Sequence, residues 1–369
     1  MKKVILLSAM LLAVTPFTVS AQTGQSAETK TPAKKKASAQ TKSSEKSAPT
    51  AKGKQPLKLV TTTPLPGFTG DFDHFALDLN GKRLFLTAED HKTVEVFDLD
   101  GKHLHSITGF DTPHAALYVP ESDKLIVADG DDDFGKAEIV DGKTYKIVNT
   151  LKLPNGADGA VYNPNNHTYY IETGSDAESV KTHAISKIDT QKLEHTGDLT
   201  FPGNHSEGMA IDHEGKKLYV NLTGENKVGV VDLASGKVEN TWAVPGAKKT
   251  NAMILDEPNH RLFITARTPP KLIILNSDNG SQVASFPISD LNDDAWYDVA
   301  HKRIYATGTG TTTVIEQKDA DHYEKIADVP TGFRAKTSIL VPELNRLYIA
   351  VSGKGKPGAK LALQVYDIQ

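Results

Sequence analysis

The chain of 369 residues contains no cysteine. Disulfide bonds, thiolate metal ligands, a cysteine nucleophile and covalently attached c-type haem are therefore excluded. Beyond residue 21 the sequence also lacks an apolar run long enough to span a bilayer, and no stretch of useful length repeats its apolar residues with a helical period. Stability must then come from a large apolar core built mainly from strands.

The first 21 residues have the organisation of a secretory signal of bacterial type. Lys2 and Lys3 precede an apolar run of 11 residues, Val4 to Val14, which is too short for a membrane span. Val19-Ser20-Ala21 places small residues at a cleavage site, so we expect cleavage after Ala21 and a periplasmic or secreted protein. With no cysteine after that site, a bacterial lipid anchor is excluded.

Residues 22–56 lack aromatic residues, Leu, Ile and Val, and we expect them to be a disordered linker. Their eight Lys and two Glu give a net charge of +6, whereas residues 57–369, with 32 basic and 44 acidic residues, carry −12. The Lys-rich segment is either a solvated spacer or a contact for an anionic cell-envelope surface.

A repeat organises residues 57–369. Each unit has an apolar stretch, a polar turn, a short second strand, and a third strand that typically ends in Asp or Asn. The expected second strands start at Leu84, Leu125, Tyr169, Leu218, Leu262, Ile304 and Leu347, in steps of 41 to 49 residues. Seven such units of short strands predict an all-β fold, a seven-bladed β-propeller.

The two ends of this region predict how the ring closes. The seventh unit reaches Gln369 directly after its third strand, so it has no outer strand of its own. Leu57 to Thr63 reads as an extra strand before the first unit. We expect that strand to complete the last blade, which removes an open sheet edge.

The stretch KLYVNLTGENKVGVVDLASGKV, residues 217–238, resembles the repeat of the YVTN-type, or YncE-like, propeller family. The positions that match this repeat are Leu218, Tyr219, Val220, Gly224, Val228, Val230, Asp232, Gly236, Lys237 and Val238. Asn221 stands where the family usually has Thr, and the other six units match more loosely. The resemblance implies a propeller, in a family of mostly exported bacterial proteins, some of which are implicated in binding single-stranded DNA.

One polar position recurs just before the inner strand of every unit. Its seven residues, called the collar below, are Asp73, His114, Asp158, Glu207, Asn251, Asp293 and Lys336. Inner strands line the central channel of a propeller, so we expect the collar to surround one channel mouth, with His74 next to it. These eight residues are the predicted ligand-binding residues, although a channel mouth can be polar simply because it is hydrated.

Carboxylates around one narrow space repel one another unless they bind protons or a cation. Oxygen ligands alone suit Ca²⁺ or Mg²⁺, and the addition of His74 or His114 suits Zn²⁺ or Mn²⁺. Glu207, Asn251 and Asp293 resemble the Glu, Asn and Asp ligands of metal-dependent sugar lactonases with related folds. That resemblance implies these three as metal ligands.

A second acidic stretch, ADGDDDFG at residues 128–135, has Asp129, Asp131 and Asp133 at the spacing of a calcium loop. The glycine of such a loop is displaced to Gly135, and Val140 stands where a bidentate Glu belongs. The alternative is a solvated acidic loop, which these departures favour.

Three functions fit the sequence. We favour an exported, non-catalytic binding or scaffold protein that presents its channel mouth to a protein, a polymer or a small ligand, and we expect a monomer. The alternative is a metal-dependent hydrolase, lactonase or lyase that uses the collar. Nucleic-acid binding is opposed by the charge of −12, because phosphate binding relies on Lys and Arg.

Overall fold

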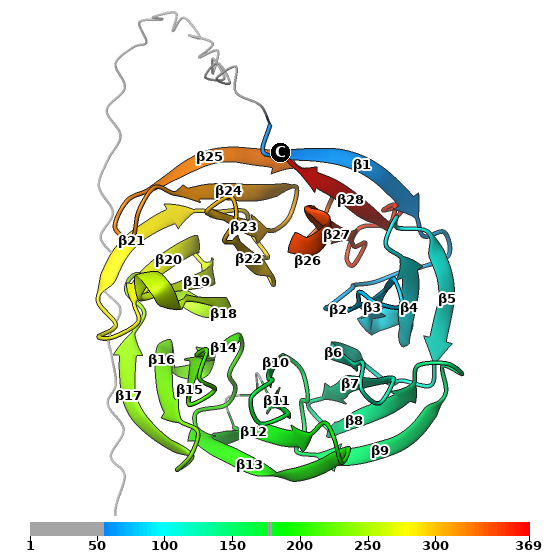
Figure 1. Ribbon diagram of the computed structural model, residues 1–369, viewed down its shortest axis with the longest axis horizontal. Coiled ribbons are helices and arrows are strands. Elements are labelled where there is room, and N and C mark those ends of the chain that lie inside the picture. The colour runs from blue at the N-terminus through cyan, green and yellow to red at the C-terminus, as the bar shows by residue number, and fades with distance from the viewer. Residues whose placement is uncertain (1–54, 176, 178) are drawn as a thin grey trace, which may run out of the picture. The chain divides into compact units, whose positions relative to one another are not determined.

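In a computed structural model, which describes residues 55–175, 177 and 179–369, seven sheets surround a central channel (Figure 1). Each sheet, or blade, has four antiparallel strands, and in the first six the strands run in chain order from the channel outward. The predicted all-β, seven-bladed propeller is therefore confirmed. The predicted signal (1–21) and nearly all of the predicted linker (22–56) lie outside the described residues.

Blades 1 to 3 follow one another along the chain. Blade 1 contains β2 (Phe75–Asp78), β3 (Arg83–Ala88), β4 (Thr93–Asp98) and β5 (His103–Thr108). Blade 2 contains β6 (Pro113–Val119), β7 (Lys124–Asp131), β8 (Phe134–Asp141) and β9 (Ile147–Leu153). Blade 3 contains β10 (Ala160–Asn163), β11 (Thr168–Thr173), β12 (Thr182–Asp189) and β13 (Glu194–Pro202).

Blades 4 to 7 complete the ring. Blade 4 contains β14 (Met209–Ile211), β15 (Lys217–Leu222), β16 (Lys227–Asp232) and β17 (Lys237–Ala243). Blade 5 contains β18 (Lys248–Asp256), β19 (Arg261–Thr268), β20 (Pro270–Asn276) and β21 (Gln282–Pro287). Blade 6 contains β22 (Ala295–Asp298), β23 (Arg303–Thr307), β24 (Thr311–Gln317) and β25 (Tyr323–Pro330). Blade 7 contains β26 (Thr337–Val341), β27 (Arg346–Val351), β28 (Ala362–Ile368) and β1 (Leu57–Pro64).

Helical structure among the described residues is limited to four single turns of 3-10 helix in the connections. These are η1 (Glu89–His91), η2 (Thr223–Glu225), η3 (Glu257–Asn259) and η4 (Pro342–Leu344). None of the helices in this described part is long and apolar enough to cross a membrane.

The ring closes as the sequence predicts. Strand β1 pairs antiparallel with β28, from Leu57 opposite Ile368 to Pro64 opposite Ala362, with one irregularity between Leu59 and Thr61. Both segments lie side by side at the rim of the ring in Figure 1. The first and last strands of the described region therefore share one sheet, and blade 7 needs both.

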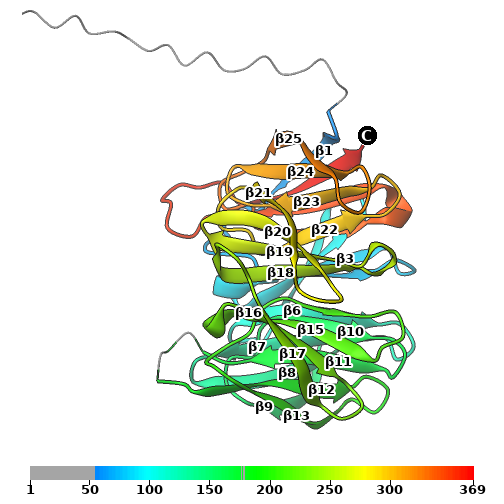
Figure 2. The ribbon, with the colours of Figure 1, turned by 90° about the vertical axis from the view of Figure 1, so that its left-hand side faces the viewer.

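The apolar core is divided among the seven contacts between neighbouring blades. Leu84 and Leu86 of β3 pack toward blade 7 against residues such as Tyr348, whereas Phe85 between them packs toward blade 2 against Leu125. Successive side chains of a strand point to opposite faces, and here both faces are covered. This explains why the second strands are apolar throughout and do not alternate with polar residues. Figure 2 shows the same ring of blades from its side.

Candidate functional site

The seven collar residues line one cavity of about 860 Å³ at the channel, and His74 lines it with them. Five of the seven lie one or two residues before an inner strand, as Asp73 lies before β2 and Asp158 before β10. His114 and Asn251 lie within β6 and β18, because those two inner strands begin earlier. The equivalent position in each repeat is thus brought to one place, although ligand binding by these residues stays a prediction.

Backbone hydrogen bonds tie neighbouring collar positions together. The amide of Ala115 donates to the carbonyl oxygen of Asp158 at 3.4 Å, and Gly208 donates to Asn251 at 3.1 Å. Asp294 donates to the carbonyl of Lys336 at 3.2 Å. These bonds join blade 2 to 3, blade 4 to 5 and blade 6 to 7, so the side chains project from a connected rim.

One half of the collar, from blades 6, 7 and 1, is charge-paired. The Lys336 ammonium lies 3.1 Å from Asp73 Oδ1 and also contacts Asp293, and all three residues are buried. Arg267 of β19 pairs with Asp293 as well. Burial opposes the charged form of Asp73, but the positive charges of His74 and Lys336 hold its pKa well below the usual value.

The opposite half, from blades 3 and 4, is acidic, and its collar carboxylates form no ion pair with Lys or Arg in the part of the chain that the structure describes. The Asp158 carboxylate is 41% exposed, and its one ion pair among the described residues is with His114 Nδ1, at 3.4 Å. Glu207 accepts a hydrogen bond from Asn251 Nδ2 at 3.3 Å. Burial and the negative charge of Asp158 raise the pKa of Glu207 to about 7. Behind them, burial and the charges of Glu207 and Asp158 raise the pKa of Glu172, which is 3% exposed, well above its ordinary value.

Two histidines stand between the halves. His114 Nδ1 lies 2.8 Å from Asp73 Oδ2, and its Nε2 lies 3.1 Å from the carbonyl oxygen of Gly130. His74 Nδ1 lies 3.2 Å from Asp294 Oδ1, and its Nε2 lies 3.7 Å from Asp73 Oδ2. Burial opposes protonation of both imidazoles, but the surrounding carboxylates raise each pKa to about 10.

The two candidate sets of metal ligands differ in their surroundings. In the predicted set, Asp293 contacts two cations, Arg267 and Lys336, which compete with a metal ion for its oxygens. Over the described residues, one group of His and carboxylate side chains has ligand atoms all within 4.8 Å of one another: Asp73, His114 and Asp158. The structure thus brings together side chains that can ligate a metal in blades 1 to 3. Metal binding by the predicted set in blades 4 to 6 stays a prediction.

Sequence reasoning missed five charged residues of the cavity: Asp71, Glu89, Arg267, Arg334 and Lys354. One signal for Arg334 was present. It lies two residues before Lys336, and Asp71 lies two residues before Asp73, so the two are equivalent positions of neighbouring blades. Their side chains form an ion pair. Aligning the repeat two residues earlier would have found that pair, whereas Arg267 and Lys354 come from a second strand and a loop.

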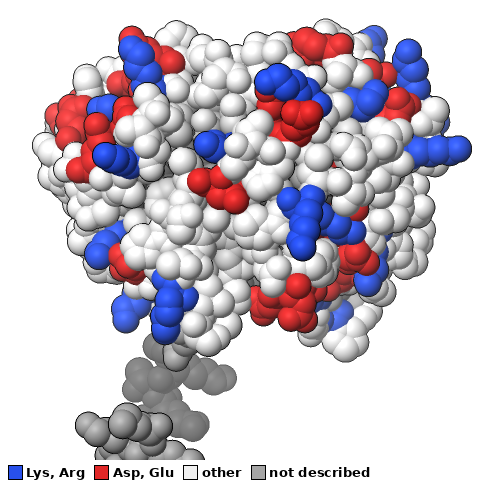
Figure 3. Space-filling view, turned by 90° about the horizontal axis from the view of Figure 1, so that it is seen from below, with Lys and Arg blue, Asp and Glu red and all other residues white. Residues whose placement is uncertain are grey.

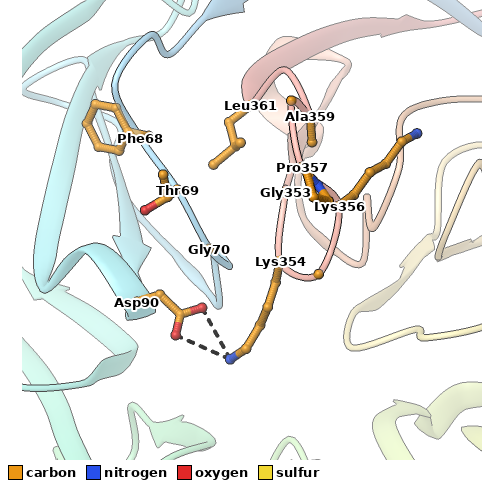
Figure 4. A pocket seen from close by; sticks show the side chains of 12 residues that line it. Phe68, Thr69, Gly70, Asp90, Gly353, Lys354, Lys356, Pro357, Ala359 and Leu361 are labelled. Carbon is orange, nitrogen blue, oxygen red and sulfur yellow. Dashed lines mark hydrogen bonds and ion pairs between the residues drawn. The ribbon is translucent and has the colours of Figure 1, made fainter.

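A smaller cavity of about 540 Å³ adjoins the site between residues 68–70 and the β27–β28 loop. Figure 4 shows Lys354 reaching from that loop to Asp90, with their charged atoms 3.2 and 3.3 Å apart. Lys354 also lines the channel cavity and pairs with Glu89. It therefore separates the two spaces.

The calcium-loop interpretation of residues 129–133 is wrong. Strands β7 and β8 pair continuously to Asp131 opposite Phe134, which leaves a tight hairpin where a loop of calcium-binding length would be. The buried Asp129 carboxylate accepts hydrogen bonds from the amides of Asp111 and Thr112 and lies 3.3 Å from Lys136 Nζ. Asp129 thus fixes the start of blade 2, and its oxygens are already engaged by these partners.

No protein-family model matches the chain. Among curated proteins, the "Uncharacterized protein YncE" of Salmonella typhi is 24% identical over 179 residues, which are 47% of this chain and 49% of that protein. The match spans about half the length of this relative. Its name assigns no activity.

Solved structures share the fold at low sequence identity. A chain in "Crystal Structure of Mitotic Checkpoint Complex" superposes with a TM-score of 0.67 at 16% identity, over 91% of this chain and 99% of that one. A chain in the hydrazine synthase of Kuenenia stuttgartiensis has a TM-score of 0.65 at 18% identity, over 78% of this chain and 96% of its own. At these identities the likeness shows the propeller fold alone.

Proposed function

The chain is a seven-bladed β-propeller of the YncE-like type, and on that premise we propose that it is a non-catalytic binding protein whose ligand site is the channel cavity. The ligand is a small polar molecule that carries a positive group. The observation that supports this is the division of the collar into a charge-paired half and an acidic half whose carboxylates form no ion pair with a Lys or Arg of the described residues.

The acidic half supplies the part of the cavity that attracts a cation. The Asp158 side chain is 41% exposed. Glu207 has a pKa of about 7, which means that its surroundings disfavour the charged form of Glu207. A positive group between these two carboxylates would offset the cost of burying their charges and would reduce their mutual repulsion. Positively charged ligands thus gain more here than neutral or negative ones.

The paired half supplies hydrogen-bond donors for the rest of the ligand. Arg267 and Arg334 line the cavity, with side chains 31% and 20% exposed. Each guanidinium has five N–H donors, more than its ion pair with one carboxylate can use. Oxygen atoms of a bound ligand would accept hydrogen bonds on this side. The cavity therefore favours a molecule that carries both positive and negative groups.

The outer surface offers no comparable feature on the face shown in Figure 3, where acidic and basic side chains lie next to one another. No extended basic area of the kind that binds nucleic acid stands out on that face. The proposal places recognition inside the ring because the acidic half of the collar lines the channel cavity.

We propose export to the periplasm or medium, with the Lys-rich segment 22–56 as a tether to an anionic envelope surface. Its support is the pattern of Lys2, Lys3, the apolar run Val4 to Val14 and Val19-Ser20-Ala21. Mass spectrometry of protein from a bacterial periplasmic fraction should find Gln22 as the first residue. An uncleaved chain in the cytosol would contradict the export proposal and leave the ligand site unaffected.

The binding proposal is tested with four probes of different charge in metal-free buffer: putrescine, glycyl-glycine, succinate and glucose. Putrescine and glycyl-glycine should raise the melting temperature and give calorimetric binding, and succinate and glucose should not. Glu207→Gln and Asp158→Asn should each weaken binding of the positive probes at least tenfold.

Asp133→Asn is the matched control, because it removes an acidic charge from the β7–β8 hairpin, away from the cavity residues. Its affinities should equal those of the parent chain. Equal binding of all four probes, or loss of binding in the control alone, would overturn the proposal. Binding of none would favour a protein or polymer partner.

A further inference from the structure

The geometry assigns a site for one divalent transition-metal ion, with Zn²⁺ as the type, to Asp73, His114 and Asp158. This set differs from the three residues that the sequence resemblance implied. The inference concerns the same cavity as the proposed function but does not depend on it, since a propeller can hold the ion whether or not it binds a small molecule.

Three ligand atoms converge at the side of the cavity formed by blades 1, 2 and 3. His114 Nδ1 lies 2.8 Å from Asp73 Oδ2 and 3.4 Å from Asp158 Oδ1, and the atoms of the three residues all lie within 4.8 Å of one another. Bonds from Zn²⁺ to nitrogen or oxygen are about 2.0–2.2 Å, so its tetrahedral ligands lie roughly 3.3 Å apart. Small side-chain rotations therefore bring all three atoms onto one ion.

The orientation of His114 is fixed from outside this group. Its Nε2 lies 3.1 Å from the carbonyl oxygen of Gly130, which can only accept a hydrogen bond, so Nε2 carries hydrogen. In the neutral imidazole, Nδ1 then presents a lone pair to two carboxylates. A proton on Nδ1 or a metal ion must lie between this nitrogen and the two carboxylates, and a carbonyl behind a ligating histidine is the usual arrangement where a metal ion takes that place.

Gly130 itself is needed for the close packing of this carbonyl's segment against the connection that leads to Asp158. A Cβ at position 130 would lie 2.4 Å from the backbone nitrogen of Ala157, in the β9–β10 connection that leads into blade 3, a distance that side-chain carbons do not adopt. Blade 2 and blade 3 thus approach one another here because the sequence has glycine. This close approach lets Gly130, whose carbonyl orients His114, lie beside the segment that carries Asp158.

The other collar contacts leave the three ligand atoms available. Lys336 takes Asp73 Oδ1, and Oδ2 remains on the side of His114. His74 stands next to the group, with Nδ1 3.2 Å from Asp294 Oδ1 and Nε2 3.7 Å from Asp73 Oδ2. A carboxylate behind its Nδ1 gives His74 the same type of support, so its Nε2 is the nearest additional ligand.

The donor set defines the class of ion. Two carboxylate oxygens with at least one imidazole nitrogen suit Zn²⁺ and similar transition metals. Ca²⁺ and Mg²⁺ prefer oxygen ligands alone, and Ca²⁺ takes six to eight of them. Since three residues fill only part of the coordination sphere, the remaining positions face the cavity and are open to water or to an oxygen atom of a ligand.

Zn²⁺ binding to the untagged chain tests the site, after treatment with EDTA and dialysis into metal-free buffer. Calorimetric titration should show one Zn²⁺ per chain, with Ca²⁺ and Mg²⁺ at least 100-fold weaker. Co²⁺ should give visible absorption typical of four or five ligands. His114→Ala and Asp158→Asn should each weaken Zn²⁺ at least 100-fold and abolish the Co²⁺ spectrum.

His322→Ala is the matched control, because His322 pairs with Asp319 at 2.9 Å on the surface and should keep full affinity when the cavity is the site. Asp158→Asn preserves shape at a partly exposed side chain, so an unchanged melting temperature will show that it folds. Binding that survives both cavity variants, or that falls equally in His322→Ala, overturns the inference. Loss of Zn²⁺ binding with retained binding of putrescine in His114→Ala would separate this site from the proposed ligand function.

Discussion

In the collar, blades 6, 7 and 1 contribute Asp293, Lys336 and Asp73, whose charges neutralise one another, whereas blades 3 and 4 contribute Asp158 and Glu207, which have no Lys or Arg ion pair within the described residues. Both halves come from one position of the repeat, on the same rim and at the same cavity. Position in the repeat therefore decides where a side chain lies, and its neighbours in other blades decide its charge state.

The difference also divides stability from binding. A buried carboxylate that is paired with a cation is costly to disrupt, because the remaining charge has no partner. A carboxylate without a Lys or Arg partner, at the edge of the cavity, contributes less to folding and leaves oxygens for another molecule or ion. We expect the paired half to hold the ring together and the acidic half to recognise ligands, as Glu207 and Asp158 allow.

The largest effect is expected for Lys336→Met in the paired half. It leaves Asp73 and Asp293 buried with one cation fewer, and should lower the free energy of unfolding by about 3–5 kcal/mol. Urea unfolding at pH 7 with EDTA measures this. Lys318→Met, which removes a surface pair with Glu316 and Glu324, should cost less than about 0.5 kcal/mol. Equal losses in the two variants would refute the comparison.

Coupling within the paired half gives the next largest effect. Asp293→Asn alone leaves Arg267 and Lys336 with fewer negative partners and should cost about 1–3 kcal/mol. Combined with Lys336→Met, it should cost less than the sum of the single changes, by about 1–3 kcal/mol. Additive losses in the same urea experiment would mean that the two residues do not act as a pair.

In the acidic half, Glu207→Gln should stabilise the protein at high pH. The folded pKa of Glu207, about 7, lies above the ordinary 4.5, so its protonated form favours the folded state below pH 4.5 and that contribution is lost as pH rises through 7. Gln removes the penalty, so the variant should gain about 1–2 kcal/mol at pH 8 and nothing at pH 4. Unfolding at both pH values measures the gain, with Glu343→Gln as the exposed control. A gain that does not change with pH would contradict the assignment.

The smallest stability effect is expected for Asp158→Asn. Because this side chain is 41% exposed and lacks a Lys or Arg partner in the described part of the chain, its stability should change by less than about 0.5 kcal/mol. The same variant should lose Zn²⁺ binding and bind putrescine at least tenfold more weakly. A large loss of stability, measured by thermal unfolding, would make Asp158 structural and erase the difference between the halves.

The repeat made most of the fold predictable from sequence. Each observed second strand begins one residue before its predicted start, as Arg83 precedes Leu84, because the polar residue at the turn already pairs across the sheet. The apolar residues in each strand also carried a signal, since burial on both faces needs Leu84, Phe85 and Leu86 in succession. Closure by β1 followed from the missing outer strand of the last unit.

Local sequence was a poor guide where a motif stood outside the repeat. The Asp129 spacing suggested a calcium loop, but hydrogen bonds to Asp111 and Thr112 and the pairing of β7 with β8 turn its carboxylate inward. A short-range pattern cannot include such partners, because they come from a neighbouring connection and a neighbouring strand.

By itself, the sequence determined that seven equivalent polar residues meet at one channel mouth, since a period of about 40 residues carries each of them to the same place in its blade. Only the tertiary structure decided which of them meet a cation. Lys336 reaches Asp73 across 263 positions of the chain, and Arg267 reaches Asp293 from a second strand. Charge pairing depends on distances of a few ångströms between blades, and the sequence order does not contain those distances.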